Sequence, residues 1–321
     1  MKSIPLRWAV GTLVGSVALG VAACVALTTA ETRRVHRLVP QDGKLVDIEG
    51  EQLHCVDLGE GPPIVMIHGL GGQLRNFHRL VERLSQNHRV VLVDRPGSGY
   101  SRKGRLPELS SINGQARLML SLFEHLGLEK PLVVGHSFGG AVALSLALQA
   151  PERVSGLALI APLTHLVETL PPAFKGLAIE PEALRRALAW TLVAPMSRWG
   201  PRAPMQQVFH PDPVPADFDD LGGGGLARRP GNYQNSAQEL RAIPADLQGM
   251  TERYHQLQVP VRVLFGEGDT ILAPKVHGEG LVGKYPKASL EVVSGGHMLP
   301  VTQPEKTAAW LEQAAKDFQP S

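Results

Sequence analysis

The sequence predicts an α/β protein with a mostly parallel central sheet, helices on both faces and a helical cap inserted into the core. Short apolar runs alternate with segments of helical periodicity from residue 64 to 160 and again from 261 onwards, which is typical of parallel strands joined by helices. Residues 163–255 break this alternation with helical stretches and proline-rich loops. We therefore expect them to form a cap inserted after the sixth core strand.

The core is expected to begin with a hairpin, because residues 45–48 and 53–56 alternate apolar and polar residues around a turn. Further strands are predicted at 64–67, 89–93, 131–135, 155–160, 261–266 and 290–293, with helices near 74–86, 112–127 and 138–150. Cap helices are predicted at 180–194, 233–242 and 246–256. The chain thus divides into an N-terminal segment (1–40), two core parts (41–162 and 256–321) and the cap (163–255).

The pattern Gly-His-Ser-Phe-Gly at residues 135–139 lies between an apolar strand and an apolar helix. A serine on such a sharp strand-to-helix turn is presented at the helix N-terminus, where backbone N–H groups can meet an anion. This context predicts that Ser137 is a nucleophile. The backbone N–H of Phe138, the residue after it, is expected to be one donor of an oxyanion hole.

A serine nucleophile needs a base to accept its proton and an acid to orient that base. Asp269 follows strand 261–266, and His297 follows strand 290–293. We expect His297 to be the base and Asp269 the acid. Glu267 is a nearby rival for the acid, although the spacing from Gly266 favours Asp269.

Five motifs in this order resemble the α/β-hydrolases. They are His68-Gly69 after strand 64–67, Asp-Arg-Pro-Gly-Ser-Gly-Tyr-Ser at 94–101, the turn at Ser137, Gly266-x-x-Asp269 and Gly296-His297. The resemblance spans about residues 44–318 and implies the α/β-hydrolase fold with a cap domain. It also implies that the backbone N–H of Leu70 is the second oxyanion donor, and that Asp94, Ser98 and Ser101 belong to a structural motif rather than a second catalytic set.

Dehalogenases and epoxide hydrolases of this superfamily use an aspartate where this chain has Ser137, so the resemblance implies an esterase-like or lipase-like serine hydrolase without a cofactor. We expect cleavage of a small apolar or lipid-like carboxylic ester through an acyl-enzyme. The same triad could serve C–C bond or amide hydrolysis, acyl transfer or peracid formation, or the fold could persist in a binding protein without turnover. Candidate lining or cap-core residues are Trp190, Leu192, Met196, Trp199, Met205 and Phe209.

The N-terminal segment 8–30 has no charged residue and is long enough to cross a bilayer. We expect a single-pass anchor, in a bacterial inner membrane, with its orientation open. A signal peptide cleaved after Ala30 and a lipoprotein signal at Cys24 are alternatives. Arginines follow the segment at positions 33, 34 and 37, and we expect this basic stretch, up to residue 40, to be a linker to the core.

A net charge of +2 does not suggest a nucleic-acid surface. The histidines show no metal-binding spacing, no dinucleotide fingerprint is present, and Cys24 and Cys55 do not suggest a disulfide framework. The glycine run 222–225 is expected to be a surface loop or, alternatively, a hinge for lid motion. The oligomeric state stays open.

Overall fold

The computed structural model describes residues 6–104, 107–200 and 202–318, with side chains described from residue 15 onwards and from residue 108 after the first gap. Within these residues the core is a sheet of eight strands in the order β1-β2-β4-β3-β5-β6-β7-β8. Only β2 runs against its neighbours, so the sheet is mostly parallel as predicted. The strands are β1 (Lys44–Ile48), β2 (Glu51–Leu58), β3 (Pro63–Ile67), β4 (Arg89–Val93), β5 (Leu132–His136), β6 (Gly156–Ile160), β7 (Val261–Gly266) and β8 (Ala288–Val293).

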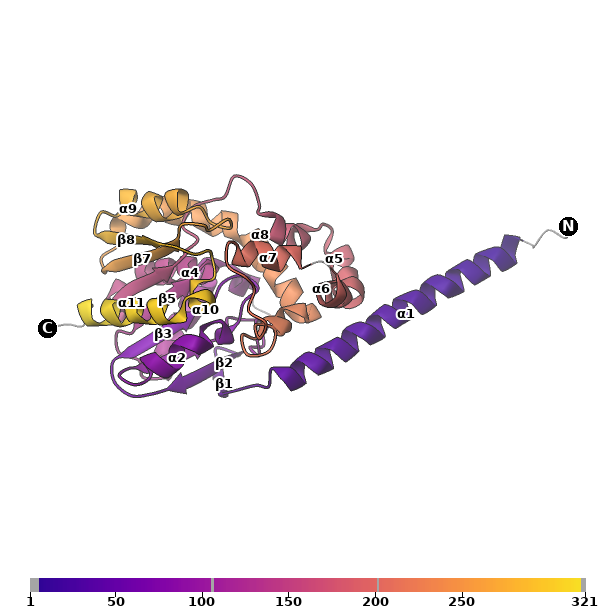
Figure 1. Cartoon of the computed structure of the whole chain (residues 1–321), viewed down its shortest axis with the longest axis horizontal. Coiled ribbons are helices and arrows are strands. Elements are labelled where there is room, and N and C mark those ends of the chain that lie inside the picture. The colour runs from indigo at the N-terminus through magenta and orange to yellow at the C-terminus, as the bar shows by residue number, and fades with distance from the viewer. Residues whose placement is uncertain (1–5, 105–106, 201, 319–321) are drawn as a thin grey trace.

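Helices cover both faces of the sheet (Figure 1). Val65 and Ile67 of β3 pack into one hydrophobic cluster with α3 (Ile112–His125) and α4 (Phe138–Gln149). Ile64 and Met66 pack into a second cluster with α2 (His78–Leu84) and α11 (Pro304–Asp317). A strand buried on both faces needs apolar residues at every position, which explains the continuous apolar runs in the sequence.

The sheet reverses its order at β3, which lies between β4 and β5. Connections from these strands leave in opposite directions at such a point, so a crevice opens at the carboxyl ends of the strands. The predicted nucleophile follows β5 at this position.

Between β6 and β7 the described chain forms helices only: α5 (Glu182–Leu188), α6 (Ala194–Trp199), α7 (Ala203–Phe209) and α8 (Pro230–Arg253), with shorter turns among them. A π-helical turn, η5 (Ala189–Val193), joins α5 directly to α6. The prediction of two helices at 233–242 and 246–256 was wrong, because α8 is continuous across Pro244. A proline inside a helix removes one backbone hydrogen bond, and here the helix continues despite that loss.

The expectation of a surface loop at 222–225 was also wrong, because all four glycines are buried. The carbonyl oxygen of Gly222 accepts hydrogen bonds from the side chains of Gln73 (2.7 Å) and Asn76 (3.0 Å). Gly223 has a φ of +69°, and a β carbon on Gly225 would lie 3.4 Å from Val35. These glycines therefore allow a close approach of the N-terminal helix, the cap and the segment after β3.

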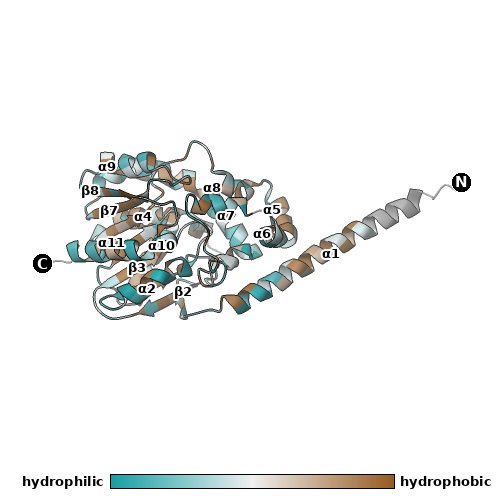
Figure 2. Cartoon of the chain, in the orientation of Figure 1, coloured by the Kyte–Doolittle hydropathy of each residue, from teal (hydrophilic) through white to brown (hydrophobic). Residues whose placement is uncertain are grey.

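The N-terminal helix α1 (Leu6–Leu38) projects from the body (Figure 1), and its part from Gly15 to Leu38 is long and apolar enough to cross a membrane. Figure 2 shows hydrophobic residues along this part. The basic segment that we expected to be a linker continues the helix. Thr28, Glu31 and Val35 are buried at a spacing of three and four residues, so one face of the last turns packs against the cap.

The remaining short helices of the core are α9 (Gly280–Lys284) and α10 (Leu299–Thr302).

Candidate functional site

Ser137 lies on the turn between β5 and α4 with φ 54° and ψ −118°, which is strained for a residue with a side chain. Three backbone hydrogen bonds hold it there. Its N–H donates to Ile160 O (3.0 Å), and its carbonyl accepts from the N–H groups of Gly140 and Leu163 (both 2.9 Å). The flanking glycine is required by space, since a β carbon on Gly135 would lie 2.5 Å from Gly139 O.

His297 and Asp269, which follow β8 and β7, form a buried pair. The Nδ1–H of His297 donates to Asp269 Oδ2 (2.7 Å), and Asp269 Oδ1 accepts from the N–H groups of Ile271 (2.8 Å) and Leu272 (2.9 Å). Burial raises the pKa of Asp269, but the interaction with His297 and the two backbone donors together lower it below its usual value. The carboxylate thus fixes the imidazole tautomer in which Nε2 is the proton acceptor.

His136 connects this pair to Ser137. Its Nε2–H donates to the carbonyl oxygen of His297 (2.9 Å), and the two rings are 5.0 Å apart. Burial, aided by His297, lowers the pKa of His136 to about 3, so the ring is neutral at neutral pH. His136 therefore keeps the loop of His297 beside the turn of Ser137. The rival acid Glu267 lies on the exposed surface.

The predicted oxyanion donors flank Ser137. Phe138 is the first residue of α4, and the first N–H groups of a helix have no acceptor within the helix. Leu70 lies in a turn closed by Gly72 N–H and Gly69 O (3.1 Å), which leaves the N–H of Leu70 out of that bond. A β carbon on Gly69 would lie 3.0 Å from Ser137 Cβ, so this turn lies directly against the serine.

A buried arginine that the sequence analysis did not single out holds this turn. Arg95 donates from Nε to His68 O and from Nη2 to Gly69 O (both 2.9 Å), and its guanidinium lies 4.5 Å from the centre of the Phe138 ring. Its charge is balanced by Glu239 of α8, with 2.5 Å between Nη1 and Oε1 and no exposure of either side chain. Only the position of Arg95 inside the 94–101 motif could have indicated it.

The other polar residues of the 94–101 motif have structural partners. Asp94 accepts from the N–H groups of Leu74 and Tyr100 (both 2.7 Å) and lies 2.7 Å from His54 Nδ1. The hydroxyl of Ser101 donates to Asp94 O (2.6 Å). These bonds fasten the loop after β4 to its neighbours, as expected of a structural motif.

The six apolar cap residues fall into two groups. Met205 and Phe209 contribute to a small hydrophobic cluster in which Phe218 of the cap packs against Met298 and Val301 of the core. The other four are 41–61% exposed, so membership of a cap core was the wrong expectation for them: Trp190, Leu192, Met196 and Trp199.

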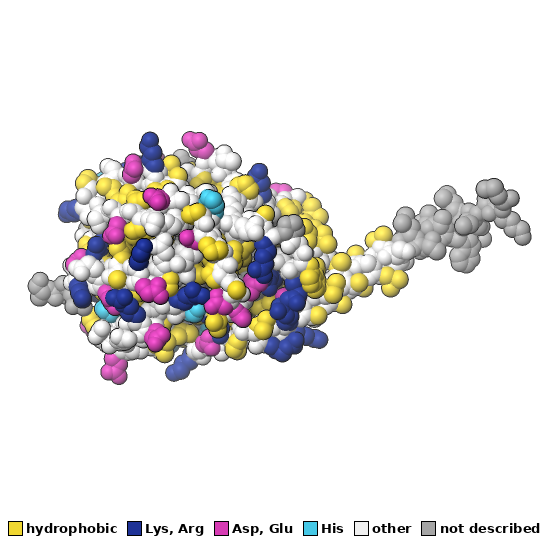
Figure 3. All heavy atoms as spheres, viewed as in Figure 1, with side chains coloured by type: hydrophobic (Ala, Val, Ile, Leu, Met, Phe, Trp, Pro, Cys, Tyr) yellow, Lys and Arg dark blue, Asp and Glu magenta, His cyan; other side chains and the backbone are white. Residues whose placement is uncertain are grey.

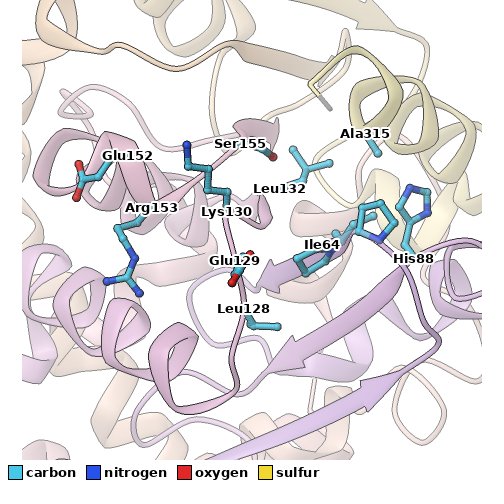
Figure 4. A pocket seen from close by; sticks show the side chains of 12 residues that line it. Ile64, His88, Leu128, Glu129, Lys130, Leu132, Glu152, Arg153, Ser155 and Ala315 are labelled. Carbon is cyan, nitrogen blue, oxygen red and sulfur yellow. The ribbon is translucent and has the colours of Figure 1, made fainter. Parts of the chain in front are cut away.

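A surface cavity of about 650 Å³ lies at the amino-terminal ends of the central strands, on the side of the sheet opposite the ends that carry Ser137 (Figure 4). Pro63, Leu132 and Ser155 line it, and they lie at the amino ends of β3, β5 and β6. Ser137 follows the carboxyl end of β5, so this cavity is separate from the candidate active site.

Comparison with known proteins agrees with this architecture. A family described as "alpha/beta hydrolase fold" matches residues 62–304. The chain belongs to this family, and it is a hydrolase.

A dihydrolipoyllysine-residue acetyltransferase component of the acetoin cleaving system from Pseudomonas putida is 31% identical over 81% of this chain and 65% of its own length. A 2-hydroxy-6-oxononadienedioate/2-hydroxy-6-oxononatrienedioate hydrolase from Comamonas testosteroni is 27% identical over 75% of this chain and 82% of its own. The crystal structure of a bacterial membrane phospholipase A has a TM-score of 0.65 at 21% identity, covering 98% of this chain and 99% of that one.

Proposed function

We propose that this protein hydrolyses carboxylic esters through an acyl-enzyme on Ser137, with His297 as base and Asp269 as the acid that orients it. The observation that carries the proposal is the strained Ser137 beside a buried His–Asp pair 2.7 Å apart. A serine without such partners would have no reason to occupy a strained, buried turn at the carboxyl edge of the sheet.

In the proposed reaction, Ser137 Oγ attacks the ester carbonyl carbon while His297 Nε2 accepts its proton. The N–H groups of Phe138 and Leu70 stabilise the negative oxygen of the tetrahedral intermediate. Its collapse breaks the C–O bond, and the leaving alcohol takes the proton from His297. Water then attacks the acyl-enzyme with His297 again as base. The bond between the acyl carbon and Ser137 Oγ breaks, Oγ takes the proton back from His297, and the carboxylic acid leaves.

We further propose that the ester is apolar or lipid-like and that α1 anchors the enzyme in a membrane. The apolar stretch of α1 and the likeness to a membrane phospholipase A along nearly the whole chain support both points. Cleavage after Ala30 would remove Thr28, which is fully buried against the body, and this favours retention of the helix over a cleaved signal. Lipid attachment at Cys24 would keep these contacts and remains the alternative form of anchor.

The test is active-site labelling of the full chain in detergent with a fluorophosphonate, together with hydrolysis of p-nitrophenyl esters of increasing chain length. We expect labelling and a burst of product in the wild type, and loss of both in Ser137→Ala. Ser155→Ala, at the opposite edge of the sheet, is the matched control and keeps both. Turnover that survives Ser137→Ala would overturn the mechanism.

Cleavage of a C–C bond is the second candidate, because a relative that matches 75% of this chain is named as a hydrolase of 2-hydroxy-6-oxononadienedioate and 2-hydroxy-6-oxononatrienedioate. The same enzyme preparation assayed on 2-hydroxy-6-oxononadienedioate distinguishes the two. We expect the ester to have the higher kcat/KM, and the reverse order would favour the second candidate.

A further inference from the structure

Four large apolar side chains on the outside of the cap share one side of a continuous helical stretch. Leu192, Met196 and Trp199 follow each other at intervals of four and three residues, and Leu184 precedes them by two turns. Their exposed fractions range from 41% to 61%. We call these four residues the cap apolar face. Contiguous apolar surface of this kind on a folded protein marks a contact with a partner or a membrane.

This face lies beside the place where α1 leaves the body. Figure 3 shows hydrophobic side chains gathered over α5 and α6, next to the projecting apolar helix. An ion pair fixes the position of α6 along the axis of α1, since Arg198 of α6 lies 3.4 Å from Glu31 of α1. Arg228 holds the same carboxylate from the other side at 3.4 Å. The cap therefore contacts α1 at a fixed position along the helix, around Glu31.

The length of the apolar stretch of α1 places the bilayer surface near Glu31, where the cap contacts the helix. An apolar core about 30 Å thick takes roughly 20 helical residues, at about 1.5 Å each. The uncharged stretch begins at Trp8 and ends before Glu31. A span that begins at Trp8 therefore ends within the turns that precede Glu31, where burial of α1 against the body also begins. The cap apolar face is then brought to the boundary between acyl chains and headgroups.

The surrounding charges suit an anionic lipid surface. Arg33 and Arg37 are exposed just after the apolar stretch of α1. Arg34 is half-buried and pairs with Glu31 (3.3 Å), and the exposed Arg186 of the cap pairs with Glu182 (3.2 Å). Basic residues at this depth are attracted to anionic headgroups, and tryptophan favours the interface because its ring is apolar while its N–H remains in a polar layer. Both features are present around Trp199.

We propose that the cap apolar face inserts into the headgroup region of the same bilayer that holds α1, so that the cap above Ser137 takes its substrate from the membrane. The occupant of the face is a lipid bilayer. The substrate class is the acyl ester of a membrane lipid, and this second part rests on the proposed ester hydrolysis. The orientation of the cap rests only on α1 and the apolar face.

The direct test places an environment-sensitive fluorophore at Met196→Cys in the full chain, in nanodiscs containing anionic phospholipid with a nitroxide near the headgroup. Cys24→Ala removes the other accessible thiol, and Cys55 is buried with its pKa raised to about 12, so it is unreactive. Lys316→Cys on α11, at the opposite end of the body from α1, is the matched control (Figure 1). We expect strong quenching by the lipid nitroxide at position 196 and little at position 316.

Equal, weak quenching at both positions would overturn the proposal. Shielding of position 196 only in discs that hold two copies would also overturn it, because a second copy rather than lipid would then cover the face.

A second measurement compares the variant Met196→Glu/Trp199→Glu with wild type on phospholipid vesicles and on a soluble p-nitrophenyl ester. We expect kcat/KM on vesicles to fall about tenfold or more, because apolar area leaves the bilayer and charge is placed at its edge. Hydrolysis of the soluble ester is retained, since that substrate reaches Ser137 without the bilayer. An equal loss on both substrates would overturn the substrate assignment.

Quenching at position 196 in a protein that hydrolyses neither substrate would refute the proposed function and leave the membrane face standing.

Discussion

Replacement of Glu239 by glutamine tests whether the buried ion pair holds the turn beside Ser137. The variant removes the negative charge while it keeps the size of the side chain. The guanidinium of Arg95 then remains fully buried without a counter-ion, and an amide donor faces its N–H groups. Loss of one partner of a buried pair costs about 3–5 kcal/mol of folding free energy. For a folded body of this size, with an unfolding entropy of about 2.1 cal/mol/K per residue, we expect the melting temperature to fall by roughly 5–9 °C.

The assays are urea unfolding and thermal unfolding of the full chain in detergent, both followed by circular dichroism, with Glu312→Gln as the matched control. Glu312 pairs with Arg83 in an equally close arrangement, with 2.6 Å between Oε2 and Nη2, but on the surface. Exposed pairs contribute about 0–1 kcal/mol, so the control variant remains near wild type. If both variants lose the same small amount of stability, the reasoning from burial is refuted.

The same variant also has a kinetic consequence. Arg95 holds the carbonyl oxygens of His68 and Gly69, and Gly69 precedes the predicted oxyanion donor Leu70. Displacement of that donor lowers kcat by up to about 10²–10³-fold, measured on folded protein at low temperature. Unchanged kcat would show that the turn keeps its position without Arg95 and Glu239.

Three further outcomes follow from the site. Asp269→Asn is expected to lower kcat by about 10⁴-fold on a p-nitrophenyl ester without unfolding the protein, because the amide no longer selects the tautomer of His297; retention of wild-type kcat would remove Asp269 from the mechanism. Stability is expected to fall as pH drops from 6.5 towards about 3, because the pKa of His136 is about 3 in the folded protein and 6.5 when unfolded. The unfolded state then binds more protons than the folded state, so the free energy of unfolding changes by up to about 1.4 kcal/mol per pH unit. Urea unfolding at several pH values measures this dependence, and a weaker dependence in His136→Gln would identify His136 as its source. Gly135→Ala places a β carbon 2.5 Å from a carbonyl oxygen in α4 and is expected to prevent folding, whereas Gly283→Ala meets nothing within 4 Å and is expected to be tolerated; soluble yield and melting temperature distinguish them.

The core strands could be predicted because burial on both faces leaves a continuous apolar run, as in β3 and β5. The residues around Ser137 could be predicted for a related reason. Parallel strands carry their following loops to one edge of the sheet, so Asp269 and His297 were recognisable from their positions after β7 and β8.

What the sequence did not reveal depends on contacts between distant segments. Arg95 and Glu239 are 144 residues apart, and no local pattern indicates that their charges meet inside the protein. The burial of glycines 222–225 depends on Gln73 and Val35, which approach only in the folded chain. The continuity of α8 through Pro244 likewise depends on the packing of the cap rather than on helix propensity.

The packing of the last turns of α1 determines where the chain can be shortened. A protein that begins at residue 41 lacks Val35 and Val39, which cover Leu226 and Gly225, and lacks Glu31, which balances Arg228. Such a protein would expose apolar surface and leave a largely buried arginine with one fewer counter-ion. A soluble form for crystallisation is better begun near residue 24, so that the buried Thr28, Glu31 and Val35 are kept.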